Sequence, residues 1–176
     1  MANVTYDKNC LTVLDHPLVG HKMTILRDES TVPAHFRKLV HELAALEAYE
    51  ATRDLPTLQV QVKTPICETE GVRLKDDTLA VVPILRAGMG MLEGVLSVVP
   101  SAAVGVLGME RDEETHEPHS YYAKMPQGIE NRMALVIDPM LATGGSALAS
   151  IKYLREAGVK DIRLLVMVAA PQGVAG

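Results

Sequence analysis

Large aromatic side chains are nearly missing from this chain of 176 residues, because tryptophan is absent and phenylalanine occurs once. Hydrophobic residues nevertheless make up 48% of the sequence, with many valines, leucines and alanines. The core must therefore be aliphatic, as in α/β proteins with buried parallel strands. A chain of this length is expected to form a single domain over residues 1–176.

Cysteines, basic runs and long apolar runs are scarce as well. Cys10 and Cys67 are too few and too isolated for a disulfide framework or a Cys-x-x-Cys metal clip, so reduced thiols in a cytoplasmic protein are expected. The net charge of −5, without a lysine- or arginine-rich run, argues against sequence-independent binding to nucleic acid or anionic lipid. No apolar run approaches the ~18 residues of a membrane span, and the N-terminus lacks a signal-peptide pattern. Neither secretion nor a membrane anchor is predicted.

The hydrophobic pattern predicts strands and helices in alternation. Continuous apolar runs have the character of buried strands, and helix-compatible stretches lie between some of them, the last ending at Gly158. This alternation predicts an α/β fold with a mainly parallel sheet, whose ligand crevice lies beyond the carboxyl ends of the strands. The predicted strands are 79–85, 102–107, 133–137 and 162–170, and the predicted helices between them are 89–99 and 146–157.

Other segments have different patterns. Residues 33–49 follow capping residues and an early proline and predict an amphipathic helix. Leu58, Val60 and Val62 alternate with polar residues, which predicts a strand covered on one face and followed by a hairpin or edge element. The polar stretch 108–128 predicts a lid or an extended hairpin over a site. Residues 171–176 have the character of a helix start.

The most informative segment is 138–146, Asp-Pro-Met-Leu-Ala-Thr-Gly-Gly-Ser, between a predicted strand and a predicted helix. Such a turn presents backbone N–H groups at the positive end of a helix, where a phosphate can bind. Asp138 stands at the strand end, within reach of the group that carries the phosphate. An anion site beside a carboxylate suits a sugar phosphate, since the carboxylate accepts hydrogen bonds from ribose hydroxyls.

This segment resembles the phosphoribosyl-diphosphate signature of phosphoribosyltransferases, in the form typical of the uracil phosphoribosyltransferase family. Three further stretches are similar to that family and occur in its order. They are His-Pro-Leu-Val at 16–19, Val-Pro-Ile-Leu-Arg-Ala-Gly at 82–88, and Arg-Asp-Glu-Glu-Thr-His-Glu-Pro at 111–118. The resemblance implies a type I phosphoribosyltransferase fold with an N-terminal helix and a β-hairpin or lid. It also implies that a C-terminal segment that recognises uracil in the family is absent, so no uracil-binding residue is assigned.

The implied reaction joins uracil to 5-phosphoribosyl 1-diphosphate and yields UMP and diphosphate. The implied cofactor is Mg²⁺, carried mainly by the substrate's diphosphate, and no metal-binding residue of the protein is assigned. A homo-oligomer and activation by GTP are further expectations of the family. Catalytic roles are implied for Asp138 and Arg86. Substrate binding is implied for Arg86, Arg111, Asp138, Pro139, Met140, Leu141, Ala142, Thr143, Gly144, Gly145 and Ser146.

Two other functions compete with this interpretation. A regulatory protein of the same fold could bind RNA, although the acidic balance argues against it. The glycines of 88–94 suggest an NAD(P)-binding Rossmann oxidoreductase, but Glu93 stands where the fingerprint has its third glycine. His116 and His119 flank a proline, which favours a solvated loop over a metal site. The remaining polar candidates are His16, His21 and Lys22, for which a contact with the ligand or a subunit interface and a plain surface position are equally compatible with the sequence.

Overall fold

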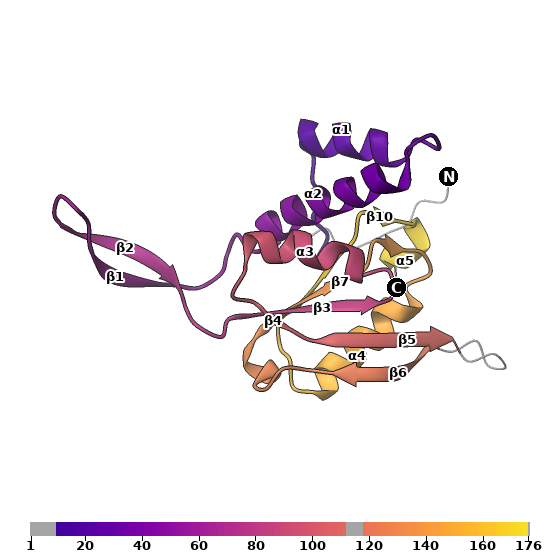
Figure 1. Ribbon diagram of the computed structural model, residues 1–176. Helices are drawn as coiled ribbons and strands as arrows, with labels where there is room; N and C mark the ends of the chain where they lie inside the picture. Colours follow the sequence, from indigo (N-terminus) through magenta and orange to yellow (C-terminus); the bar gives the residue numbers. More distant parts are fainter. Residues whose placement is uncertain (1–9, 112–117, 176) are drawn as a thin grey trace.

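The computed structural model describes residues 10–111 and 118–175 (Figure 1). The helices are α1 (Pro17–Leu26), α2 (Pro33–Ala51), α3 (Met89–Val98), α4 (Gly145–Glu156) and α5 (Pro171–Ala175), with a 3₁₀ turn at Ile129–Asn131. The strands are β1 (Thr57–Lys63), β2 (Glu68–Leu74), β3 (Leu79–Leu85), β4 (Ala103–Val104), β5 (Val106–Arg111), β6 (Pro118–Lys124), β7 (Met133–Ile137), β8 (Met140–Leu141), β9 (Ile162–Leu165) and β10 (Val168–Ala169).

The central sheet has the strand order β6-β5-β3-β7-β9, with the short β4 paired to β3 as its sixth strand. All neighbours in this order pair in parallel except β5 and β6, which form an antiparallel hairpin. The predicted mainly parallel sheet is therefore confirmed. Parallel pairing aligns the carboxyl ends of β5, β3, β7 and β9 along one edge, where the loops that follow these strands meet.

Both faces of the sheet are covered, which explains why the strands are continuous apolar runs rather than alternating ones. On one face, Val81 and Leu135 pack against a cluster that includes α2 and α3. On the other face, Val82 and Val136 pack with Leu154 of α4. Figure 1 shows α2 and α3 side by side over the sheet, with α1 lying outside them.

The predicted helix at 33–49 is confirmed as α2. It begins at Pro33, in the first helical turn, and ends where the Thr52 amide donates to the carbonyl of Ala48. The preceding helix α1 was not predicted. Its N-cap is His16, whose imidazole Nδ1 accepts a hydrogen bond from the Leu18 amide at 3.1 Å, and histidine is an uncommon capping residue.

The structure contains two hairpins, one outside the central sheet and one at its edge. The β1–β2 hairpin projects from the rest of the molecule (Figure 1), and every residue of its two strands is exposed except Val60 and Gly71, which are half-buried. The expectation that one face would be covered is therefore wrong within the described part of the chain. The second hairpin, β5–β6, corresponds to the polar stretch 108–128 and confirms its extended-hairpin alternative.

Two predicted strands are interrupted. The run 102–107 divides at Gly105 into β4 and β5, and the run 162–170 divides into β9 and β10. The break after Leu165 occurs because β10 leaves the central sheet and pairs with β8 instead. No helix in the described part of the chain has both the length and the hydropathy needed to cross a membrane.

Candidate functional site

Three candidate residues follow or end neighbouring parallel strands at the same edge of the sheet. Asp138 follows β7, Arg86 follows β3, and Arg111 is the last residue of β5. The strands are in register at this edge, since Pro83 is paired with Ile137 and Leu85 with Gly108. The Arg111 side chain and residues 112–117 lie outside the described part of the structure, so the predicted lid contacts remain expectations.

The loop between β7 and α4 has the geometry of an anion site. Gly144 is the N-cap of α4 and has a φ of 86°, in the left-handed region that glycine adopts without a Cβ penalty. As a glycine, this N-cap has no side chain with which to cap the helix, so the first N–H groups of α4 form the positive end at which an anion can bind. The carbonyl of Gly144 accepts the Leu148 amide at 2.8 Å, which begins the helix immediately after the loop.

A pocket open to solvent lies inside this loop, with about 390 Å³ of empty space including its mouth. The loop supplies most of the wall. Leu164 of β9 and Val166, just after β9, supply an apolar side. The wall residues are Asp138, Met140, Leu141, Ala142, Thr143, Gly144, Gly145, Ser146, Ala147, Leu164 and Val166.

Asp138 is the acidic residue of this wall. Its carboxylate is half-buried and accepts a long hydrogen bond of 3.4 Å from the Met140 amide. Burial raises the pKa of the Asp138 carboxyl above its ordinary value, while the Met140 amide opposes this in part. The remaining lone pairs of the carboxylate face a pocket in which a sugar hydroxyl is a suitable donor.

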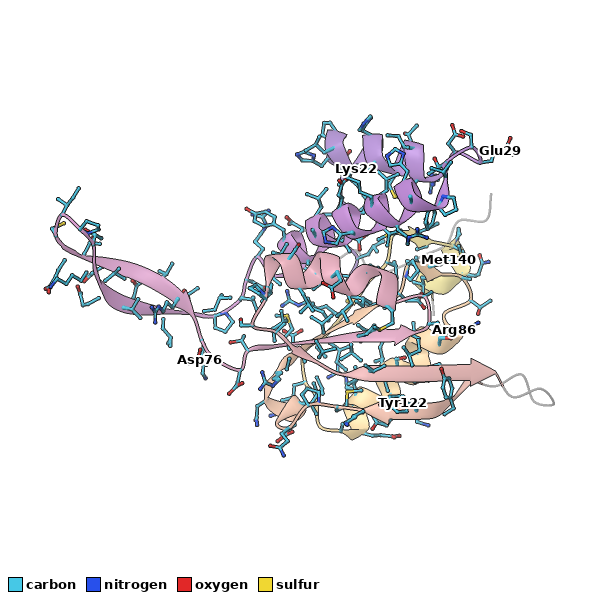
Figure 2. The ribbon with its side chains drawn as sticks, viewed as in Figure 1. Lys22, Glu29, Asp76, Arg86, Tyr122 and Met140 are labelled. Atoms are coloured by element: carbon cyan, nitrogen blue, oxygen red, sulfur yellow. The ribbon has the colours of Figure 1, made fainter. Side chains whose placement is uncertain are left out.

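Arg86 is exposed at the same end of the sheet as Met140, as Figure 2 shows. The loop that carries it is anchored by Gly88, where an added β-carbon would stand 2.4 Å from the carbonyl oxygen of Ile137. Because Ile137 directly precedes Asp138, this contact couples the loop after β3 to the loop after β7. Gly88 thus permits close packing between the two loops, and a Rossmann fingerprint is not needed to explain it.

Most of the predicted site residues are brought together, and some are not. Asp138, Met140 and residues 141–146 line the pocket, whereas Pro139 and Arg86 are not among its wall residues. Leu164 and Val166 were not predicted, although their position near the carboxyl end of a predicted strand was an available signal. His16 caps α1 and Lys22 forms an ion pair with Glu42 of α2, while His21 is exposed. Among the described residues, no group of three or more histidine, cysteine or acidic side chains is placed to hold a metal ion.

Comparison with known proteins identifies relatives of this chain. The family model described as uracil phosphoribosyltransferase matches residues 13–176. A uracil phosphoribosyltransferase from Lactobacillus gasseri is 53% identical over 163 residues, which are 93% of this chain and 78% of that protein. Another from Macrococcus caseolyticus is 54% identical over 162 residues, or 92% of this chain and 78% of that protein.

Solved structures agree with these relatives. The AQ2163 protein of Aquifex aeolicus superposes with a TM-score of 0.85 at 37% identity, covering 93% of this chain and 78% of its own. A purine phosphoribosyltransferase from Pyrococcus horikoshii has a TM-score of 0.55 at 10% identity, over 80% of this chain and 77% of its own, so it shares the fold. The family match over nearly the whole chain, together with these likenesses, places the protein in the uracil phosphoribosyltransferase family of pentosyltransferases, with the type I phosphoribosyltransferase fold.

Proposed function

We propose that this protein transfers the 5-phosphoribosyl group of 5-phosphoribosyl 1-diphosphate to uracil. The bond between carbon 1 of the ribose and a diphosphate oxygen breaks, a bond from carbon 1 to uracil N1 forms, and N1 loses its proton. The products are UMP and diphosphate. The observation that carries this proposal is the pocket of the 138–146 loop, in a chain more than half identical to two uracil phosphoribosyltransferases.

The 5′-phosphate is assigned to the turn at the start of α4. Backbone N–H groups of Gly144, Gly145 and Ser146 lie at the uncapped positive end of that helix, which favours an anion. The hydroxyls of Thr143 and Ser146 are additional donors in the wall of the same pocket. The ribose then lies toward Asp138, whose carboxylate accepts hydrogen bonds from its hydroxyls.

The leaving diphosphate is assigned to the arginines. Arg86 offers a planar group of five donors that matches phosphate oxygens and stabilises charge that grows as the bond breaks. Arg111 ends the neighbouring strand, so it is assigned to the same group. Because positive charge develops on the ribose ring, catalysis depends on position and charge stabilisation more than on a protein nucleophile. A lid over the site would exclude water that competes with uracil.

Magnesium is proposed as the cofactor. An ion bound to the oxygens of the substrate needs few protein ligands, and the Asp138 carboxylate in the pocket wall is a donor of the type that Mg²⁺ prefers. When bound, the ion neutralises charge on the diphosphate. The residues of this chain bind the phosphate, orient the ribose and hold the leaving group.

We also propose a homo-oligomeric state, activation by GTP, a cytoplasmic location, and the absence of a nucleic-acid partner. Sedimentation analysis tests the first, assays with GTP the second, and salt-dependent RNA binding the last.

The deciding experiment incubates the 176-residue chain with uracil, 5-phosphoribosyl 1-diphosphate and Mg²⁺, and detects UMP by chromatography. Adenine and hypoxanthine replace uracil in the controls. UMP formed from uracil alone is the expected result. Saturable binding of 5-phosphoribosyl 1-diphosphate without product would restrict the proposal to the phosphoribosyl half of the reaction, and no binding would overturn it.

A further inference from the structure

The first half of the pocket loop is held by a segment distant in sequence. β8, which forms part of the loop, pairs in parallel with β10, so that Met140 is in register with Val168 and Leu141 with Ala169. The carbonyl of Pro139 accepts the Val168 amide at 3.2 Å, and the carbonyl of Leu141 accepts the Ala170 amide at 2.8 Å. The position of the loop therefore depends on residues near 168–170 as well as on its own sequence.

The chain that leaves β10 then turns back onto the loop at Gly173. This residue is buried in the short helix α5, and its amide donates to the carbonyl of Ala170 at 3.0 Å. An added β-carbon at Gly173 would stand 2.6 Å from the carbonyl oxygen of Ala142 and 3.0 Å from that of Leu141. Both are backbone atoms, which cannot rotate away as the end of a long side chain can.

Gly173 also faces the second half of the loop. An added β-carbon at Gly144 would stand 3.6 Å from the carbonyl oxygen of Gly173 and 3.8 Å from its Cα. The backbone of Gly173 is thus packed against Leu141 and Ala142 and also lies near Gly144. Gly144 is the N-cap whose geometry opens the helix end to an anion.

Backbone conformation does not explain a glycine at this position. The glycines with positive φ among the described residues are Gly128, Gly144 and Gly158, and Gly173 is not one of them. In a helix, alanine is the more favourable residue, because glycine has a higher entropic cost of ordering. The reason for a glycine here is therefore the lack of space for a side chain next to the loop.

We propose that Gly173 is a positioning residue for the phosphate-binding loop: its missing side chain lets residues 141–144 sit at the depth required to hold the 5′-phosphate. This inference rests on the proposed function, in which that loop binds the phosphate. A methyl group at Gly173 would displace the carbonyl of Ala142 and, through the chain, the N–H groups that follow it. Gly173 itself does not touch the substrate.

The test is the Gly173→Ala variant of the full chain, with ribose 5-phosphate as the probe in isothermal titration calorimetry. This probe has the phosphate and ribose but no diphosphate. The dissociation constant is expected to rise about tenfold or more, because displacements of a positioned group by an ångström have effects of this order. In the enzyme assay, KM for 5-phosphoribosyl 1-diphosphate should rise by more than kcat falls.

Two controls separate this effect from a general loss of structure. Gln172→Ala changes an exposed neighbour in the same turn, and Gly20→Ala adds a methyl group where no atom lies within 4 Å. Both should bind ribose 5-phosphate as the unchanged chain does. Circular dichroism should show that Gly173→Ala is folded at the temperature of the titration while its binding weakens.

Equal binding by Gly173→Ala and the unchanged chain would overturn this inference alone. Absence of binding by the unchanged chain would overturn the proposed function along with it. If Gly173→Ala does not fold, hydrogen exchange in the unchanged chain decides. Ribose 5-phosphate should slow exchange of the Val168 and Ala170 amides, which donate to loop carbonyls, and slowed exchange confined to 143–146 would contradict the inference.

Discussion

Gly94 of α3 lies so close to His41 of α2 that a β-carbon built on it would stand 2.2 Å from the His41 carbonyl oxygen. The same β-carbon would be 2.9 Å from Cβ of Ala44. The two helices therefore approach each other at a distance that only glycine permits. Since α3 begins directly after the loop of Arg86, this contact also determines where that loop leaves the sheet.

Gly94→Ala is expected to lower the free energy of unfolding by about 3 kcal/mol, because the helices must separate to admit the methyl group. Thermal denaturation followed by circular dichroism measures this. Gly90→Ala is the matched control in the same helix, where the nearest atom, Cγ1 of Val40, would lie at an ordinary 3.7 Å. Its stability should be unchanged or slightly higher, and an equal loss in both variants would contradict the packing argument.

The buried carboxyl of Glu47 on α2 should make the free energy of unfolding fall as the pH rises. Its Oε2 atom is buried without a hydrogen-bond partner among the described residues, and burial raises the pKa of the carboxyl from 4.5 to about 7. Below about pH 4.5 the group is neutral in both folded and unfolded chains and has no effect. Between that pH and about 7 the unfolded chain ionises first, so folding is progressively disfavoured, by about 3 kcal/mol in total.

Glu47→Gln should remove this pH dependence. Urea denaturation at pH 4 and pH 8 is expected to show a variant that is distinctly more stable than the unchanged chain at pH 8 and about equal to it at pH 4. Glu156→Gln, at an exposed position on α4, serves as the control and should follow the unchanged chain at both values. A pH profile of Glu47→Gln identical to that of the unchanged chain would show that Glu47 ionises normally.

Asp138→Asn is expected to reduce turnover on the order of 10- to 100-fold, the scale of a lost hydrogen bond to a charged group. The fold should remain intact, since Asp138 lies at the pocket and no salt bridge in the described structure involves it. Because its pKa is raised, the unchanged enzyme should lose activity on acidification at a higher pH than an exposed aspartate would produce. This acid limb should be absent in the variant, and unchanged kinetics would remove Asp138 from the site.

Arg86→Lys tests whether the planar guanidinium is needed in addition to its charge. A lysine keeps the charge but cannot offer the paired donors, so kcat/KM for 5-phosphoribosyl 1-diphosphate should fall about tenfold or more. Stability should not change, because Arg86 is exposed. Arg27→Lys, an exposed substitution after α1, is the control for a general effect of the exchange. Equal activity of all three proteins would assign the diphosphate to other residues.

Local patterns in the sequence determined much of the architecture. Strands β3 and β7 could be predicted because a strand that is buried on both faces has a continuous apolar run in its sequence. The boundaries of α2 and α4 follow from Pro33, from the glycines of the loop and from Gly158, which all act through the backbone of their own segment. The loop at 138–146 was predicted as a phosphate site for the same reason, since its small residues and its place between strand and helix are local properties.

Long-range contacts decided the rest. An apolar run such as 162–170 does not reveal that its second part leaves the sheet and pairs with the loop at 140–141, because the same hydrophobicity serves either partner. A glycine in the sequence does not reveal what lies against it, so the contacts of Gly94 with His41 and of Gly173 with Ala142 required the folded chain. The sequence therefore predicted which loop would bind a phosphate, and the tertiary structure determined which distant backbone holds that loop in place.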